Sequence, residues 1–311
     1  MQYLSFSEFE WIVVDNDSGD NSEQIITQKF PFVQWIAMGY NAGFARANNK
    51  GIQIAKSNVV LLLNPDTLII NDTINQCYNR FMNDSFAACG VQQYFADGTA
   101  QISGNFFMKG GLNHLLPLPY WGTLLRTIAF SMKVKKPNVE RASTVEEVDW
   151  ISGAFLMVKK SAIEKVGLMD EDFFLYAEEV EWCSRLQKAG RLCIYGDIAI
   201  THICGEAISN ATQTDDKTYA NLFDKKGLQL IVSNHLRIRK QFGVTWFLFQ
   251  LLNYTWAVPV FFVCSFFDHL IRLQNPFAEI KKIYGLSSNV CAIWVLAPKI
   301  ISNKPHFYKM F

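Results

Sequence analysis

Short, largely apolar runs alternate with helical patterns along the first third of the chain. The four runs are Trp11 to Val14, Gln34 to Ala37, Val59 to Leu63 and Ala87 to Val91. Between the second and third runs, apolar and small side chains recur at helical spacing, namely Phe44, Ala47, Gly51, Ile52 and Ala55. This alternation predicts an α/β fold in which helices cover a mostly parallel sheet.

The run from Val59 to Leu63 is continuously apolar, which is typical of a strand that is buried on both faces. We therefore expect a central strand that delivers Asn64, Pro65 and Asp66 to its carboxyl end. Open α/β sheets bind their ligands at that edge. The triplet after this strand is accordingly a candidate binding element.

The pattern is less regular from residue 100 to residue 145, where glycines and prolines interrupt aromatic stretches. We expect a long, partly mobile excursion there. Order returns with an apolar strand from Val148 to Val158. A helix is then expected from about Ala177 to Ala189, with Glu178 and Glu179 in its first turn.

The segment from Val244 to Phe267 has no charged residue and many aromatic side chains, and a basic cluster of Arg237, Arg239 and Lys240 precedes it. At about 1.5 Å per residue it would span about 36 Å as a helix, enough for a bilayer. Three residues weaken the case for a simple span: Gln250, Asn253 and Pro259. Three alternatives stay open: a re-entrant or interfacial membrane segment, a true span, and an ordinary buried helix pair.

The chain has 311 residues, a length that suits one large domain and an appendage. We place the domain at residues 1–205 and a helical, aromatic-rich tail at residues 206–311. Apolar residues make up 50% of the chain and aromatic residues 14%, so the tail is expected to be membrane-associated. A net charge of +1 does not supply the broad basic surface of a nucleic-acid-binding protein, and we expect no nucleic-acid partner.

The seven cysteines are scattered without a CxxC pair. This spacing is typical of reduced thiols in the cytosol, and not of a disulfide framework or a zinc cluster. The N-terminal sequence MQYLSFSEFE has neither a basic n-region nor an apolar h-region, so we expect no signal peptide. The catalytic part should therefore face the cytoplasm.

Two of the predicted strands end in short polar turns. Asp15 and Asn16 follow the first strand, and a carboxylate at this place can accept hydrogen bonds from a base or a ribose hydroxyl. Asp66 follows the third strand and could hold a hard divalent cation that binds diphosphate oxygens. A simpler alternative stays open for both, because both sequences also initiate turns.

Two adjacent carboxylates, Glu178 and Glu179, stand at the start of the predicted second helix. One could serve as a general base while its neighbour tunes the pKa, although the helix dipole also favours carboxylates in a first turn. Glu181, four residues before Arg185, is expected to form a surface ion pair. His202 follows an apolar strand and could complete a metal shell, but a lone histidine is more often structural.

Taken together and in this order, these elements resemble glycosyltransferase family 2, particularly its bacterial rhamnosyltransferase-like members. Five motifs carry the resemblance, which covers about residues 11 to 205: VVDNDS at 13–18, GYNAGFARANNKG at 39–51, LNPDT at 63–67, WISGA at 150–154 and FFLYAEEVEWC at 173–183. The resemblance implies a GT-A fold, that of nucleotide-diphospho-sugar transferases. Asp15 would contact the nucleoside, and four asparagines would lie beside the nucleotide sugar, namely Asn16, Asn41, Asn48 and Asn64.

The resemblance also implies a metal site and an acceptor site. Asp66 would occupy the metal-binding position of the family's DXD element, and His202 would be its late metal-ligating histidine. The metal would be Mg2+ or Mn2+. Asp149, Trp150 and Gly153 would border the acceptor pocket.

Two features depart from the family pattern. The family has aspartate as the base in a Glu-Asp pair, whereas this chain has Glu179 after Glu178, which moves the carboxylate outward by one methylene. The family also has a first strand and helix before the VVD strand, whereas ten residues precede Trp11 here. Loss of that strand would expose strand edges. Three alternatives stay open: an N-terminally shortened gene product, an alternative start, or a chain whose activity is impaired.

The implied reaction is inverting transfer of a hexosyl group from a nucleoside diphosphate sugar, with rhamnose as the candidate sugar. The acceptor would be a saccharide or a polyprenyl-linked intermediate of bacterial surface polysaccharide synthesis, at the cytoplasmic face of the inner membrane. The rival interpretation is a catalytically impaired remnant that acts as a membrane-associated binding protein. A dinucleotide-dependent oxidoreductase is poorly supported, because no Gly-x-Gly-x-x-Gly follows a predicted strand.

Overall fold

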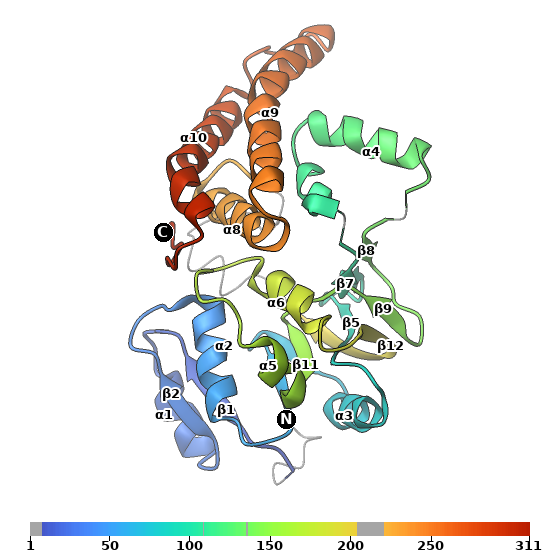
Figure 1. Ribbon diagram of the computed structural model, residues 1–311, viewed down its shortest axis with the longest axis vertical. Helices are drawn as coiled ribbons and strands as arrows, with labels where there is room; N and C mark the ends of the chain where they lie inside the picture. Colours follow the sequence, from blue (N-terminus) through green and yellow to red (C-terminus); the bar gives the residue numbers. More distant parts are fainter. Residues whose placement is uncertain (1–7, 108, 135, 204–220) are drawn as a thin grey trace. The chain divides into compact units, whose positions relative to one another are not determined.

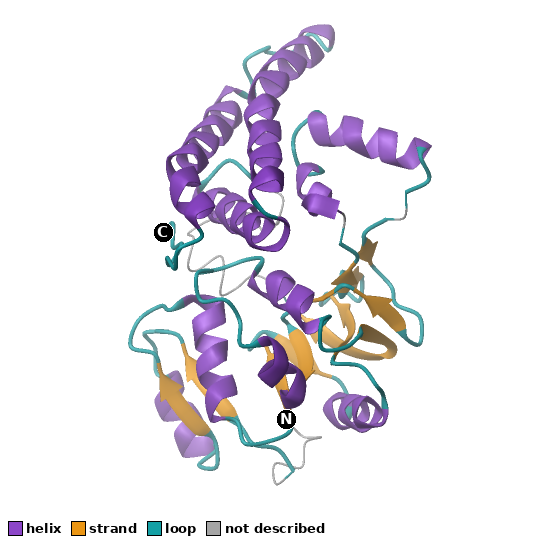
Figure 2. Cartoon of the chain, viewed as in Figure 1, coloured by secondary structure: helices purple, strands orange, loops and turns teal. Residues whose placement is uncertain are grey.

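The computed structural model describes residues 8–107, 109–134, 136–203 and 221–311. It divides the chain into two compact units. The α/β unit contains Met1–Phe106 and Asn138–Glu206, and the helical unit contains Phe107–Pro137 and Ala207–Phe311. Strands are confined to the α/β unit in the described part of the chain (Figure 2). The irregular segment from residue 100 to residue 145 is therefore divided between the units, with Phe107–Pro137 in the helical unit and the rest in the α/β unit.

A small parallel sheet begins the α/β unit. Strand β1 (Ile12–Asp15) pairs with β2 (Gln34–Ala37), and α1 (Ser22–Lys29) connects them. Helix α2 (Gly43–Ile54) then packs against β1, where Gly51 lies beside the Val14 side chain. These elements form the strand and helix alternation that the apolar runs predict.

The second sheet of the α/β unit is larger and mixed. Its strand order is β3-β11-β5-β12-β4, with β6 beside β5 and β9 beside β12. The bounds are β3 (Val59–Leu63), β4 (Thr67–Ile69), β5 (Ala88–Tyr94), β6 (Ala100–Gln101), β9 (Glu146–Val148), β11 (Phe155–Lys159) and β12 (Leu192–His202). Among the strand pairs of this sheet, only β5 and β12 are parallel. Strand β11 lies between β3 and β5 and is antiparallel to both. The expectation of a mostly parallel sheet is corrected on this point.

Strand β3 lies at one end of this sheet and not at its centre. It pairs with β11, and only Leu62 of its five residues is buried. Because β1 pairs with β2 in a separate sheet, β3 has an open edge within the described residues, and its side chains stay partly exposed. The strand was predicted correctly, but its central position was wrong.

A third, small sheet lies close to the predicted acceptor motif. Its strand order is β10-β7-β8, with bounds β7 (Gly104–Asn105), β8 (Asn138–Val139) and β10 (Trp150–Ile151). The single strand expected from Val148 to Val158 is therefore split into the end of β9, β10 and β11. A turn containing Gly153 separates β10 from β11.

Helices cover both faces of the large sheet. Helices α5 (Lys160–Val166) and α6 (Glu178–Leu186) pack over one core, in which Trp182 and Leu156 are buried. Helix α3 (Thr73–Asn83) packs over a second core, in which Phe81 and Phe155 are buried (Figure 1). Packing in these two cores holds the sheet in place, and the ends of its strands are positioned with it.

The helical unit contains three long helices, α8 (Lys225–Phe242), α9 (Val244–Ile271) and α10 (Ile280–Ser302). Gly243, with φ of 91°, ends α8 and allows α9 to begin directly. Helices α9 and α10 are each long and apolar enough to cross a bilayer, and a third of each apolar window is buried. The sequence predicted the first of these helices but not the second. The short helix η1 (Lys109–Leu115) and α4 (Trp121–Ser131) complete the described unit.

Candidate active site

Asp66 and His202 face each other where two strands of the large sheet pair. Strands β4 and β12 are antiparallel, with Thr67 opposite His202, so Asp66 lies beside the histidine. His202 Nε2 is 3.2 Å from Asp66 Oδ1, and the two side chains are 9% and 18% exposed. The backbone N–H of Ile203 donates to the Asp66 carbonyl at 2.9 Å. The two residues predicted as metal ligands are thus brought together by non-local strand pairing.

Gln101 holds His202 from two sides. Its Nε2 donates to the His202 carbonyl at 2.7 Å, and its Oε1 lies 3.1 Å from His202 Nδ1. Gln101 is buried on β6, which an Asp97-Gly98 turn folds back onto β5. Sequence reasoning missed this residue, and the Asp-Gly turn was the one available signal.

The arrangement of these three side chains suits a divalent cation. Since Gln101 uses its amide N–H on the carbonyl, its Oε1 accepts the proton of His202 Nδ1. The lone pair of Nε2 then faces the Asp66 carboxylate, and a shared cation would satisfy both electron-rich groups. Within the described ranges no group of three or more His, Cys, Asp or Glu side chains could hold a metal. Substrate oxygens and water commonly complete the coordination of Mg2+ in proteins.

The predicted nucleotide-binding residues lie in the turn after β1 and at the start of α2. Asp15 Oδ1 accepts from the Ser18 backbone N–H at 3.1 Å, so this oxygen forms the local turn that was the simpler alternative. Asn16 donates to Asn41 Oδ1 at 3.1 Å and accepts from the Ala42 N–H at 2.8 Å. The two asparagines therefore fasten this turn to the N-terminus of α2.

Asn48 and Asn64 are placed differently. The Asn48 amide donates to the Phe44 carbonyl at 2.9 Å, one turn earlier in α2. The backbone N–H of Asn64 donates to the Ala154 carbonyl at 3.1 Å, which joins the end of β3 to the turn before β11. Asn64 therefore connects the segment that contains Asp66 with the predicted acceptor motif at residues 150–154.

The glutamate pair lies at the start of α6 after two strained residues. Tyr176 and Ala177 have φ values of 70° and 66°, in the left-handed region that non-glycine residues rarely adopt. Glu178 is buried, and its Oε2 has no hydrogen-bond partner among the described residues. Burial, and then the neighbouring Glu179 charge, raise the pKa of Glu178 well above its ordinary value. Such strain and an unpaired buried carboxylate are typical of functional sites.

Glu179 is only partly buried and adjoins Gly153. Burial raises the pKa of Glu179 to about 7, which suits a general base at neutral pH. A Cβ atom at Gly153 would lie 3.8 Å from Glu179 Cγ and 3.1 Å from the Phe44 ring. Gly153 thus allows α2, α6 and the turn before β11 to meet.

A short chain of contacts connects the base candidate with the metal candidates. Glu179 lies beside Gly153. The residue after this glycine, Ala154, accepts a hydrogen bond from the Asn64 backbone N–H, and Asp66 follows Asn64 by two residues. His202 faces that aspartate. The candidate ligands and the candidate base therefore share one edge of the large sheet, as the strand-end argument predicts.

The other two predicted acceptor residues lie beside α6 and β7. Asp149 Oδ1 accepts from the Gln187 amide at 2.6 Å, which anchors the segment before β10 to the end of α6. Trp150 is partly buried, and its indole N–H has no hydrogen-bond partner in the described part of the chain. A hydroxyl-rich acceptor could accept from this indole.

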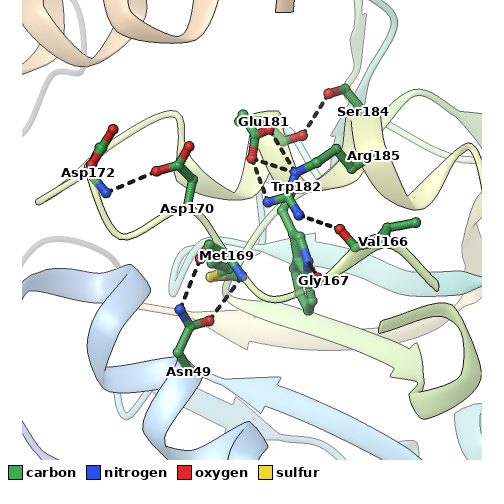
Figure 3. A network of polar contacts seen from close by, with 10 residues as sticks. All are labelled: Asn49, Val166, Gly167, Met169, Asp170, Asp172, Glu181, Trp182, Ser184 and Arg185. Atoms are coloured by element: carbon green, nitrogen blue, oxygen red, sulfur yellow. Dashed lines mark hydrogen bonds and ion pairs between the residues drawn. The ribbon is translucent and has the colours of Figure 1, made fainter. Parts of the chain in front are cut away.

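A polar network below α6 fixes the helix that carries the glutamates (Figure 3). The buried Asn49 amide bonds both the carbonyl and the N–H of Met169, at 2.9 and 3.0 Å. Arg185 bonds Glu181 and the Val166 carbonyl. The ion pair expected between Glu181 and Arg185 is present, with Oε2 2.7 Å from Nη2. Its expected surface location was wrong: Glu181 is only 7% exposed, because the Arg185 side chain turns inward to the α5 carbonyl.

Sequence comparison relates this chain to known glycosyltransferases. Residues 2–138 match the sequence profile of Glycosyl transferase family 2. An N-acetylglucosaminyl-diphospho-decaprenol L-rhamnosyltransferase of Mycobacterium tuberculosis is 30% identical over 199 residues, covering 59% of this chain and 62% of that protein. The low-salt glycan biosynthesis hexosyltransferase Agl10 of Haloferax volcanii is 28% identical over 184 residues, covering 58% and 53%. The chain thus spans less than two thirds of these relatives.

The fold is shared with a solved glycosyltransferase. A crystal structure of GalNAc-T7 with UDP, GalNAc and Mn2+ superposes with a TM-score of 0.51 at 11% identity, covering 95% of this chain and 52% of that chain. The predicted GT-A fold and the rhamnosyltransferase-like family resemblance are confirmed.

Proposed function

We propose that this chain, which carries a glycosyl transferase family 2 domain, transfers a sugar from a nucleoside diphosphate sugar to an acceptor hydroxyl with inversion at the anomeric carbon. The observation that carries the proposal is the single sheet edge that presents Asp66 and His202 together with Glu179. Charge neutralisation and proton removal are both needed for this reaction, and that edge offers a residue for each.

Asp66 and His202 would hold Mg2+ or Mn2+, with Gln101 orienting the histidine. A cation bound there would neutralise the diphosphate oxygens and make the nucleoside diphosphate a better leaving group. Asp15 would accept a hydrogen bond from the nucleoside. The asparagines at the α2 and β3 ends would line the remainder of the nucleotide sugar site, namely Asn16, Asn41, Asn48 and Asn64.

Glu179 would remove the proton of the acceptor hydroxyl. The resulting oxygen forms its bond to the anomeric carbon from the side opposite the diphosphate, while the bond to the diphosphate oxygen breaks. The proton remains on Glu179, the electron pair leaves with the diphosphate, and one displacement inverts the centre. Glu178 is a positioning residue in this scheme: its buried carboxyl lies next to the base, and burial and then the Glu179 charge raise the pKa of Glu178 itself.

The acceptor would be a saccharide or a polyprenyl-linked saccharide, bordered by Asp149, Trp150 and Gly153. The name of the mycobacterial relative supports rhamnose as the donor sugar and a polyprenyl diphosphate acceptor. Two long apolar helices and six free cysteines among the described residues support a site at the cytoplasmic face of a membrane.

The test is transfer by the detergent-solubilised chain from a panel of nucleoside diphosphate sugars to a polyprenyl-diphosphate N-acetylglucosamine. We expect Mn2+-dependent product of inverted configuration and stoichiometric release of nucleoside diphosphate. Glu179→Gln should slow transfer by about 100-fold to 10,000-fold, whereas Glu147→Gln, on an exposed surface ion pair with Arg191, serves as the matched control. Metal-dependent donor binding without product from any panel member would support the impaired remnant instead.

A further inference from the structure

Helix α4 exposes a stripe of apolar side chains. Leu124 is 49% exposed, Ile128 is 46% exposed, and Met132, directly after the helix, is 71% exposed. Their four-residue spacing places all three on one face. Only Gly122 of the 11 helical residues is buried. A helix of this length is marginal in water, so a stable α4 needs a partner for its apolar face.

The remaining surface of α4 carries polar and basic side chains and the ring of Phe130, which is 57% exposed. Thr123 and Arg126 lie on the side of the helix opposite Ile128, and Lys133 and Lys136 follow the helix. No acidic residue occurs from residue 121 to residue 136. An apolar stripe beside a basic, acid-free surface is typical of helices that lie in the plane of a membrane interface.

Contacts fasten α4 to the apolar helix α9. The Trp121 indole N–H donates to Asn253 Oδ1 at 3.0 Å, and the Tyr120 ring lies 6.1 Å from the Phe261 ring. Asn253 was one of the polar residues that weakened the case for a membrane helix, and this bond satisfies its carbonyl. Tyr120, directly before α4, and Trp121, its first residue, therefore both contact α9.

The surface of α9 continues the apolar character of α4. Leu252 and Trp256 are 57% and 59% exposed. The first charged residue of α9 is Asp268, near its C-terminal end. A lipid surface fits this combination better than a folded protein partner, because both helices show large apolar side chains and the only charges on α4 and directly after it are basic.

We propose that α4 is an interfacial helix of an anionic membrane. Leu124, Ile128 and Met132 would enter the boundary between headgroups and acyl chains, and Lys133 and Lys136 would bind lipid phosphates. This extends membrane contact to residues 121–136, and it rests on the membrane location proposed for α9 and α10. The chain would then bind the membrane through elements that precede and follow the second segment of the α/β unit, Asn138–Glu206.

The test places an environment-sensitive nitrobenzoxadiazole probe on α4 of the full-length chain. Ile128→Cys carries the probe on the stripe, and Thr123→Cys, at an exposed position on the opposite side of the helix, is the matched control. Both are made in a background whose dye-reactive native cysteines are replaced by serine. The protein is reconstituted in phosphatidylcholine vesicles with or without phosphatidylglycerol, and brominated acyl chains serve as quenchers.

We expect quenching at position 128 to exceed that at position 123 by at least about threefold in the anionic vesicles. Lys133→Glu with Lys136→Glu should reduce it, while flotation of the whole chain with the vesicles persists. Equal quenching at both positions in protein that floats would overturn the proposed role of α4 and leave the membrane location of α9 and α10 standing. Failure to float would overturn this role and the proposed membrane location together. A probe at position 128 that is shielded only at high protein concentration and is not quenched by lipid would identify a second copy of the chain as the partner and contradict the proposal.

Discussion

The imidazole of His202 lies between two side chains, with Nδ1 3.1 Å from Gln101 Oε1 and Nε2 3.2 Å from Asp66 Oδ1. The glutamine is a ligand-orienting residue in this arrangement, because it selects the tautomer whose Nε2 lone pair faces Asp66. None of these contacts is local in sequence. The proposed cation site therefore depends on correct pairing of β4, β6 and β12.

Gln101→Leu should weaken Mn2+ binding by about 10-fold to 100-fold, because the histidine loses the bond that fixes its tautomer. Electron paramagnetic resonance of free Mn2+ measures this directly in the presence of nucleoside diphosphate. Gln101→Glu should recover part of the affinity, since a carboxylate can still accept from Nδ1. Equal affinity of the leucine variant and the unmodified chain would show that Gln101 has only a structural role.

Glu179→Gln should lower kcat by about 100-fold to 10,000-fold while the donor Kd stays within about twofold, because general base catalysis contributes about that much. Rates of nucleoside diphosphate release and calorimetric donor titration measure the two quantities. Glu179→Asp should retain more activity than the glutamine variant, because it keeps a carboxylate. A glutamine variant with full transfer activity would remove Glu179 from the mechanism.

The pH profile of kcat/KM should rise through about pH 7, where the Glu179 carboxyl loses its proton. The reason is that burial raises the pKa of Glu179, so the base is protonated and inactive below that value. Rates measured from about pH 5.5 to about pH 8.5 test this expectation. A profile that is flat over this range would mean that another group, or none, removes the proton.

Glu178→Gln should stabilise the fold at high pH. Burial raises the pKa of Glu178, so the folded state favours the protonated carboxyl; the stability this provides is complete below the unfolded pKa and is lost as pH rises through the folded pKa. Glutamine removes this dependence. The melting temperature of the variant should therefore exceed that of the unmodified chain by more at about pH 8.5 than at about pH 5.5. A constant difference would contradict an ionising buried carboxyl at this position.

Gly43→Ala should destabilise the fold by more than about 2 kcal/mol. A Cβ atom at Gly43 would lie 2.2 Å from the Phe174 carbonyl oxygen, and φ is +78°. The segment before α6 would have to move away from α2. Urea unfolding measures the loss, and Gly98→Ala provides a control with a similar φ and open space around the Cβ atom. A Gly43 variant no less stable than this control would show that the close approach is unimportant.

The sequence predicted the local elements of the site well. The apolar runs identified β1, β2 and β3, and the helical spacing identified α2 and α6. Residues directly after those strands and at the α6 start became the site candidates. These predictions succeed because strand and helix periodicity depends on residues close in sequence.

The remaining features depend on residues distant in sequence or on conformations that composition does not reveal. The edge position of β3 follows from its pairing with β11, about a hundred residues later. The left-handed conformation of Tyr176 and Ala177 has no sequence signal, since neither residue is glycine. The burial of Glu181 likewise results from where α5 lies relative to Arg185.

The central claim is that Asp66 and His202 hold a cation for the diphosphate. The most direct measurement is an anomalous difference map at the manganese edge from crystals soaked with Mn2+ and a nucleoside diphosphate sugar. A peak within bonding distance of both Asp66 Oδ1 and His202 Nε2, with the diphosphate on the same ion, is the predicted result. Bound nucleotide sugar with no anomalous peak at these two atoms would contradict it.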